Sequence, residues 1–231
     1  MGAEPREIAT GLWRWTGRHP DWHPGAFGAE VASYALADGR WLVLIDPLLP
    51  DPPEPVLGLL DSLVAERVEI VVTIPYHVRS AEALWARLRG RAPTAIRGHP
   101  ALARRLSDAS GFEALEPGTD GPAGITAHTI GRPRRYERPV LVASHAALAF
   151  GDAVVEVDGA LRLWSQEPVD EHKARWYAER FAPTLRPLVA LAPERVLVTH
   201  GEPVMTGATA ALAAALEAPP WHHRGPAATE R

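Results

Sequence analysis

Four apolar segments of the sequence end in a side chain that can bind a metal ion or move a proton. The segments are Leu42–Asp46, Val71–His77, Leu148–Asp152 and Val196–His200. The 231 residues include no cysteine, which excludes disulfides, thiolate metal sites and a cysteine nucleophile. Neither a serine-nucleophile motif nor a glycine-rich phosphate loop occurs. Chemistry at these segment ends therefore depends on carboxylate and imidazole groups.

A further group of chemically capable side chains lies in a long loop near the N-terminus, at residues 16–25. His19, Asp21, Trp22 and His23 occur within it. Two interpretations stay open. In one, the loop is a lid in which Trp22 stacks on a substrate and a histidine or Asp21 serves as ligand or base. In the other, it is a proline-shaped surface loop with Trp22 packed on the sheet.

The composition excludes several classes of partner. The formal net charge is -4 and no run of Lys and Arg occurs, so a nucleic acid is a poor candidate partner. No apolar run approaches the roughly 20 residues that a membrane helix needs. The N-terminal residues lack the layout of a signal peptide, and we expect a cytoplasmic protein. A small-molecule substrate or anionic ligand is the expected partner, and the oligomeric state stays open.

The pattern of apolar residues predicts sheets that are covered by helices. Antiparallel strands are expected first, followed by alternating strands and helices. The expected strands are 11–16, 31–36, 41–45, 68–73, 94–97, 125–130, 139–143, 147–155 and 195–199, and the expected helices are 55–65, 81–88, 100–106, 170–190 and 206–216. One domain is expected over residues 1–217, followed by a flexible C-terminal tail over residues 218–231.

The four segments, in this order, resemble motifs of the metallo-β-lactamase fold superfamily. Leu42–Asp46 is similar to the strand that ends in Asp, Leu148–Asp152 to the strand that ends in Gly-Asp, and Val196–His200 to the terminal strand before a Gly. The stretch from Val71 to Leu84 lies where the family carries T-H-x-H-x-D-H-x-G-G. The resemblance spans about residues 10–215. It implies an α+β fold, a four-layer αββα sandwich in which helices cover two mixed β-sheets.

The sequence departs from this motif at the metal ligands. Aligned without gaps, Ile74 and Tyr76 replace the first two His residues, and Val78 and Arg79 replace the Asp-His pair. With a two-residue deletion, His77 takes the place of the third His and Tyr76 that of the Asp. We favour this second alignment because the following helix then aligns better. In either alignment the first two His ligands are missing.

The middle histidine of the family also has no counterpart. It lies in a turn where this chain has Thr129-Ile-Gly-Arg132, so that Arg132 stands at the histidine position. His128 is nearby but too early in the chain. The resemblance therefore does not predict a two-zinc centre here.

Under the favoured alignment, His77, Asp152 and His200 remain, and in the family these belong to one of the two metal positions. Two imidazoles, one carboxylate and a water form a workable set for one zinc or iron ion. The alternative is a vestigial site held by hydrogen bonds. Because a buried unpaired carboxylate is costly, we also expect Arg79 or Arg132 to pair with Asp152 in place of a metal. Otherwise both arginines lie on the surface.

Two functions follow from these residues. In the first, the protein is a divergent hydrolase that cleaves a small ester, amide, thioester or phosphodiester with at most one metal ion, and His77, Asp152, Arg79 and Arg132 are the candidate catalytic residues. In the second, it is a non-catalytic, metal-free member of the fold that binds a small anion or a protein. The apolar replacements Ile74 and Val78 favour the second function.

Overall fold

The computed structural model of the chain describes residues 4–63 and 65–225. Its first half forms a seven-stranded sheet in the order β1-β2-β3-β4-β5-β6-β7. Strands β1 to β4 pair antiparallel, and β4 to β7 pair parallel. The strands are β1 (Arg6–Ala9), β2 (Leu12–Arg18), β3 (Glu30–Ala37), β4 (Trp41–Ile45), β5 (Arg67–Val72), β6 (Thr94–Gly98) and β7 (Phe112–Ala114).

The second half forms a four-stranded sheet in the order β13-β10-β9-β8, with a hairpin of β11 and β12 beside it. Strands β10 and β13 are parallel, whereas β8, β9 and β10 pair antiparallel. The strands are β8 (Ile125–Ala127), β9 (Val140–Val142), β10 (Ala147–Phe150), β11 (Val154–Val157), β12 (Ala160–Leu163) and β13 (Arg195–Val198).

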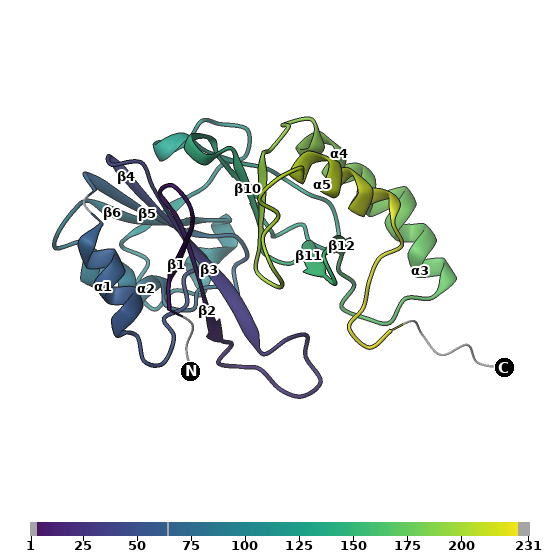
Figure 1. Cartoon of the computed structure of the whole chain (residues 1–231), viewed down its shortest axis with the longest axis horizontal. Coiled ribbons are helices and arrows are strands. Elements are labelled where there is room, and N and C mark those ends of the chain that lie inside the picture. The colour runs from purple at the N-terminus through teal and green to yellow at the C-terminus, as the bar shows by residue number, and fades with distance from the viewer. Residues whose placement is uncertain (1–3, 64, 226–231) are drawn as a thin grey trace.

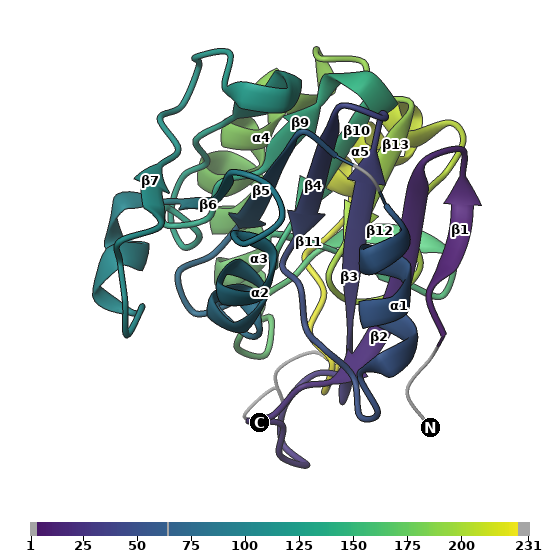
Figure 2. The same ribbon diagram turned by 90° about the vertical axis from the view of Figure 1, so that its left-hand side faces the viewer.

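Helices cover the outer face of each sheet, as Figures 1 and 2 show. Over the large sheet lie α1 (Glu54–Ser62) and α2 (Ala81–Leu88), and over the smaller sheet lie α3 (Glu171–Trp176), the π-helical turn η4 (Tyr177–Phe181), α4 (Ala182–Val189) and α5 (Ala208–Glu217). The 3-10 turns are η1 (Pro100–Arg104), η2 (Pro122–Gly124) and η3 (Ala143–His145). The predicted four-layer αββα sandwich is confirmed.

Hydrophobic periodicity explains how each layer packs. In α2 the buried residues Ala81, Leu84, Trp85 and Leu88 recur at helical spacing and face β5 and β6. Strands β4 and β5 are buried along almost their whole length because helices cover one face and the second sheet covers the other. A separate core between the two sheets joins residues such as Tyr34 to Leu197. The strand ends that carry the candidate residues are therefore held between two packed layers.

Three local expectations need correction. The predicted strand 147–155 is interrupted after Phe150, and its second part belongs to the hairpin rather than to the four-stranded sheet. The predicted helix 100–106 is only the 3-10 turn η1. Part of the predicted tail packs against the domain, since Trp221 forms a β-bridge with Trp164 and His222 is buried. Residues 226–231 lie outside the described part of the chain.

Within the described residues, no helix combines the length and the apolar character that crossing a bilayer requires.

Candidate active site

The candidate residues meet where strands of the two sheets end. Asp46 follows β4, His77 follows β5, Asp152 follows β10 and His200 follows β13. Gly151 allows this close meeting, because a Cβ on it would lie 2.5 Å from the Ile74 side chain. The absence of a side chain at Gly151 therefore lets the turn after β10 approach the turn after β5.

Asp46 holds the ring of His77 in place. Its carboxylate accepts hydrogen bonds from the Thr73 backbone nitrogen at 2.8 Å and from the Thr73 hydroxyl at 2.5 Å. The Nδ1 atom of His77 lies 3.0 Å from the Oδ2 atom of Asp46. Because an ionised carboxylate only accepts hydrogen bonds, this contact assigns a proton to Nδ1. Asp46 also has a φ of 44°, a left-handed conformation that its side-chain bonds stabilise.

The other ring nitrogen of His77 faces Asp152. Its Nε2 atom lies 3.6 Å from Oδ1 of Asp152, and Nε2 of His200 lies 3.9 Å from the same oxygen. This Oδ1 atom is buried and has no hydrogen-bond donor within the described residues. An oxygen that carries negative charge and faces two imidazoles without a donor marks a position where a proton or a cation would be stabilised.

The second oxygen of Asp152 contacts Arg134 and Tyr76. The Nη1 atom of Arg134 and the hydroxyl of Tyr76 each lie 3.5 Å from Oδ2. Burial alone would raise the pKa of Asp152, but the neighbouring side chains of His77, Arg134 and His200 outweigh burial and lower the pKa. Burial and the Asp152 carboxylate raise the pKa of Tyr76, so this phenol stays protonated. Asp152 is therefore a carboxylate at neutral pH.

The arginine on Asp152 is thus Arg134, whereas Arg132 is exposed. The chain turns here, with the Arg134 nitrogen bonded to the Gly131 carbonyl oxygen, and this turn directs the Arg134 side chain inward. Its guanidinium lies 4.7 Å above the ring of Trp164. Arg79 donates at 2.8 Å to the backbone oxygen of Asp46 and forms no ion pair with Asp152 in the described structure. The expected pairing therefore involves a different arginine.

Glu137 fixes the turn that carries Asp152. Its buried carboxyl group accepts hydrogen bonds from the backbone nitrogens of Gly151 at 2.9 Å and Ala153 at 2.8 Å. Burial, with a further contribution from the charge of Asp152, raises the pKa of Glu137 to about 8. The sequence interpretation missed both Glu137 and Arg134. The available signal was the dense run of charged residues at 132–138, between two apolar strands.

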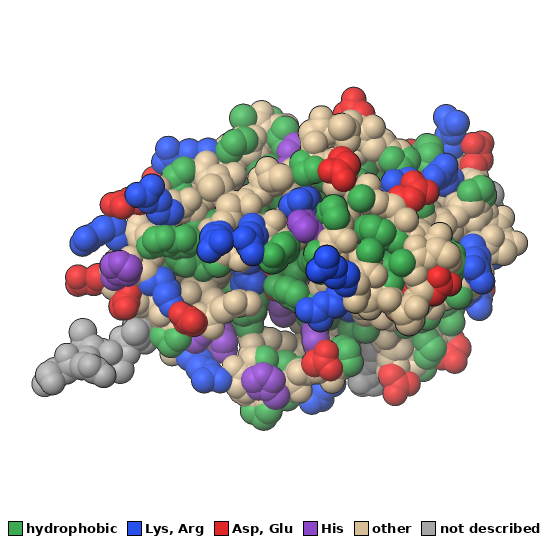
Figure 3. All heavy atoms as spheres, turned by 180° about the vertical axis from the view of Figure 1, so that it is seen from behind, with side chains coloured by type: hydrophobic (Ala, Val, Ile, Leu, Met, Phe, Trp, Pro, Cys, Tyr) green, Lys and Arg blue, Asp and Glu red, His purple; other side chains and the backbone are tan. Residues whose placement is uncertain are grey.

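A cavity of about 200 Å³ opens above these residues. Its walls include His77, Asp152 and His200 on one side and the loop of residues 19–28 on the other. Burial lowers the pKa of His200 to about 4, so its imidazole is neutral at neutral pH. In Figure 3 this loop projects at the bottom of the view, next to a hollow in the surface. The loop therefore covers the candidate site, as the lid interpretation requires.

The C-terminal segment holds this loop. Gly25 accepts hydrogen bonds through its backbone oxygen from Arg224 at 2.6 Å and from the His223 ring at 3.0 Å. Phe27 packs against the ring of His200, with ring centroids 4.6 Å apart, and against Trp221 at 4.8 Å. Within the loop, Trp22 also lines the cavity and lies beneath the guanidinium of Arg18.

Solved structures with the same architecture include metallo-β-lactamases. One from Erythrobacter litoralis is 17% identical, covers 92% of this chain and 94% of its own, and superposes with a TM-score of 0.62. One from Pontibacter korlensis is 16% identical, covers 93% of this chain and 98% of its own, and superposes with a TM-score of 0.63.

The chain has the metallo-β-lactamase fold.

The fold is not confined to β-lactamases. A chemotaxis sensor, ODP, described as a peroxy diiron species, is 14% identical, covers 94% of this chain and 95% of its own, and superposes with a TM-score of 0.59. No protein-family model matches the sequence, and no curated protein matches it. The comparisons thus establish the metallo-β-lactamase fold for this chain.

The donor atoms around Oδ1 of Asp152 suit one metal ion chemically. Two imidazole nitrogens and one carboxylate oxygen form a donor set for zinc or iron, and Asp46 holds His77 as metal-binding histidines are usually held. Two ligands about 2.0 Å from one ion are roughly 3.3 Å apart at a tetrahedral angle. The distances of 3.6 and 3.9 Å are a few tenths of an ångström wider. As placed in the described structure, no group of three or more His, Asp or Glu side chains could hold a metal ion.

Ile74 and Arg132, which align with histidines of the family, supply no ligand for a second metal position. Ile74, which replaces a histidine in the ungapped alignment, is an apolar side chain with 1% exposure. Arg132 is exposed, and His128 is half-buried outside the cavity lining. Arg134 supplies a positive charge to Asp152 instead. By residue type, the donors at Asp152 correspond to at most one ion, and Ile74 and Arg132 offer no donor for a second.

Proposed function

We propose that this protein is a hydrolase of the metallo-β-lactamase fold with a reduced centre of His77, Asp152 and His200 and at most one zinc or iron ion. The observation that carries this proposal is the buried Oδ1 atom of Asp152, which lacks a donor among the described residues and faces Nε2 of both histidines. These groups lie in the wall of a cavity that a loop covers. The proposed substrate is a small ester, amide, thioester or phosphodiester.

Each residue of the centre has a role that its contacts support. Asp46 keeps the proton of His77 on Nδ1, which leaves Nε2 free to bind or to accept a proton. The neutral His200 offers a second lone pair. Arg134 keeps Asp152 ionised and in place. When bound, an ion would polarise the substrate and lower the pKa of a water.

Metal content is the direct test of this centre. Protein prepared without a His tag or chelator is expected to hold about one zinc or iron per chain. His77→Ala, His200→Ala and Asp152→Asn are each expected to lose it, because two remaining ligands hold an ion weakly. Elemental analysis by mass spectrometry measures the stoichiometry.

Two controls separate this site from adventitious binding. His128→Ala removes a half-buried histidine that does not line the cavity. His222→Ala/His223→Ala removes two adjacent rings whose centroids lie 4.3 Å apart. Both variants are expected to keep the ion. Loss of the ion in the double variant alone, or wild-type protein that takes up no zinc or iron when these are added, would overturn the proposed metal site.

Asp46→Asn tests how His77 is oriented. The amide oxygen introduced by this change can accept the hydrogen bond from the Thr73 backbone nitrogen. The NH₂ group then faces Nδ1 of His77 and forces the proton of that ring onto Nε2. Metal affinity is expected to fall about 10- to 100-fold, the usual effect of removing such a partner. Competition with a chromophoric chelator measures the affinity, and nitrogen NMR reports the His77 tautomer. Asp61→Asn is the control, because Asp61 is exposed and its carboxylate forms ion pairs only with Arg87 and Arg91 among the described residues. An unchanged tautomer in Asp46→Asn would remove this role.

A metal-free, non-catalytic anion- or protein-binding member of the fold is the second candidate. The observation that favours it is the ion pair between Arg134 and Asp152, which already balances the charge that an ion would balance. Protein that remains without metal, combined with no hydrolysis of ester or phosphodiester panels, would select this second function.

A further inference from the structure

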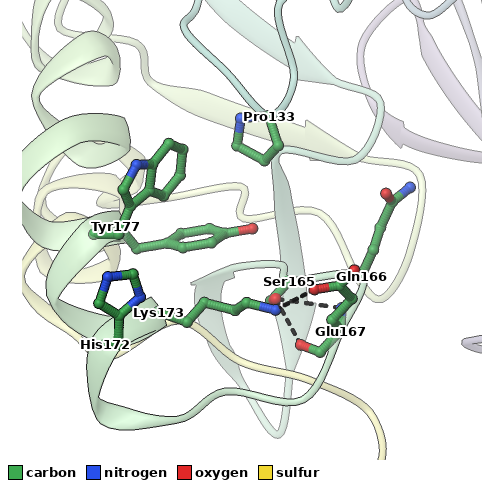
Figure 4. Close-up of a pocket in the computed structure, with 8 residues that line it drawn as sticks. Pro133, Ser165, Gln166, Glu167, His172, Lys173 and Tyr177 are labelled. Atoms are coloured by element: carbon green, nitrogen blue, oxygen red, sulfur yellow. Dashed lines mark hydrogen bonds and ion pairs between the residues drawn. The ribbon is translucent and has the colours of Figure 1, made fainter.

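A second cavity, of about 290 Å³, lies beside the candidate active site. Its size is near the lower end of the roughly 300–1,000 Å³ of small-molecule pockets, which suits a group of one or two rings. Figure 4 shows the residues that surround it. Trp176 and Tyr177 come from the helix that begins with α3, Pro133 from the turn before Arg134, and Gln166 and Glu167 from the segment after β12.

The two cavities are neighbours. Gln166 lines both of them. Trp164 lines the first cavity, whereas Ser165, the next residue, lines the second. Pro133, in the wall of the second, precedes the arginine that contacts Asp152. The second cavity therefore adjoins the cavity of His77, Asp152 and His200, with Gln166 in the wall of both.

The walls of the second cavity are aromatic and fixed. Tyr177 is buried, and its hydroxyl donates to the backbone oxygen of Trp164 at 3.2 Å. The rings of Trp176 and Tyr177 lie 5.5 Å apart, nearly perpendicular to each other. The π-helical turn η4 starts at Tyr177, and such turns are frequent at functional sites. Aromatic walls and a proline favour a flat apolar group.

The rim of the second cavity carries an ion pair between Lys173 and Glu167. Lys173 is the sole lysine in the sequence. Its ammonium group pairs with Glu167, whose side chain is 76% exposed, whereas the Lys173 side chain is 26% exposed. Glu167 can therefore turn into solvent and leave the ammonium group to a ligand carboxylate, because an exposed ion pair contributes little stability.

We propose that this second cavity binds an aromatic ring that carries a carboxylate, with the ring against Trp176 and Tyr177 and the carboxylate on Lys173. The inference rests on the proposed function in one respect, since it makes this group the part of the substrate that adjoins the bond to be hydrolysed. The binding step involves no covalent change and can be measured without turnover.

The test is titration of the full chain with 2-naphthoate by isothermal calorimetry. We expect saturable binding to the wild type, about ten-fold weaker binding to Trp176→Ala because a ring contact is lost, and roughly three- to five-fold weaker binding to Lys173→Gln. The neutral analogue 2-naphthamide should not distinguish Lys173→Gln from the wild type. Trp41→Ala is the matched control, a half-buried tryptophan on β4 that stacks with Arg40 and Arg67.

Acylation of the sole lysine provides a second readout. Lys173 should react with N-hydroxysuccinimidyl acetate more slowly when 2-naphthoate is bound. Peptide mass spectrometry would measure the extent of acetylation at this one position. If Trp176→Ala does not fold, the calorimetric test can still be made with Lys173→Gln, because the Lys173 side chain is partly exposed. Equal affinities in all variants, or no saturable binding up to about 1 mM, would overturn the proposal.

The result separates this inference from the proposed function. Naphthoate binding that depends on Trp176 and Lys173, in a protein that hydrolyses nothing, keeps the aromatic subsite and removes the hydrolase. Hydrolysis that depends on Asp152, with naphthoate binding indifferent to both residues, keeps the hydrolase and removes the subsite.

Discussion

Arg134→Ala is expected to lower the free energy of unfolding by about 3–5 kcal/mol, whereas Arg135→Ala should change it by less than about 0.5 kcal/mol. The two residues are adjacent, yet the Arg134 side chain is 4% exposed and pairs with Asp152, which is 6% exposed. The Arg135 guanidinium lies over the exposed ring of Tyr136. Removing Arg134 leaves a buried carboxylate whose Oδ2 atom keeps only the Tyr76 hydroxyl among the described residues.

Urea unfolding of the three proteins, followed by circular dichroism, measures this difference. Asp152→Asn combined with Arg134→Ala completes a double-mutant cycle, and the pair should show a favourable coupling. Adding Arg134→Ala should then cost less in the Asp152→Asn background than in the wild type. Equal effects of Arg134→Ala and Arg135→Ala would show that the buried pair does not stabilise the fold.

Glu137 is expected to make the protein less stable as the pH rises from 5 to 7.5. Its pKa is raised from 4.5 to about 8 by burial, first of all, and by the charge of Asp152. Below pH 4.5 the group is protonated in both the folded and the unfolded chain. Between the two pKa values the unfolded chain loses this proton while the folded chain keeps it, so stability falls with rising pH. Above the folded pKa the loss is complete.

The Glu137→Gln variant removes this titration and keeps the shape of the side chain. Between pH 5 and pH 7.5 the free energy of unfolding of the wild type should fall on the order of 3 kcal/mol more than that of the variant. The slope that one such group contributes is up to about 1.4 kcal/mol per pH unit. The lowered pKa of His200 acts in the opposite direction between its folded value of about 4 and 6.5, but both proteins share it. Comparing the two proteins therefore isolates Glu137.

Urea unfolding at the two pH values checks this expectation, with Glu179→Gln as an exposed control. A further cost of Glu137→Gln is expected at both pH values, because the amide has one acceptor oxygen for the nitrogens of Gly151 and Ala153. Parallel pH profiles for wild type and Glu137→Gln would show that Glu137 is ionised in the folded protein.

Arg134 and Glu137 support the same short turn, which carries Asp152. Arg134 contacts Asp152 directly, and Glu137 holds the residues on either side of it. Asp46 does the same for His77 from the end of β4. The centre thus has three reacting candidates and a shell of buried groups that fix their positions, which is the arrangement that efficient catalysis or tight ion binding requires.

The sequence alone predicted the architecture and part of the centre. The alternation of apolar strands and amphipathic helices, a local property, predicted sheets covered by helices, and the resemblance to the metallo-β-lactamase fold implied the αββα sandwich. His77, Asp152 and His200 were recognisable because each ends an apolar segment, and the structure brings their side chains together. Their role as ligands or catalysts stays a prediction.

Only the tertiary structure decided which arginine faces Asp152, what holds its turn, and what covers the site. Arg132 and Arg134 are two residues apart in one turn, and the bond from the Arg134 nitrogen to Gly131 directs the Arg134 side chain inward. Glu137 holds the turn of Asp152 by contacts to Gly151, 14 residues away, and to Ala153, 16 residues away. Gly25 bonds to Arg224 across 199 positions, and Gln166 joins two cavities. Apart from the bond within the turn of Arg134, these contacts link segments that are distant in the sequence, so no local pattern of residue types encodes them.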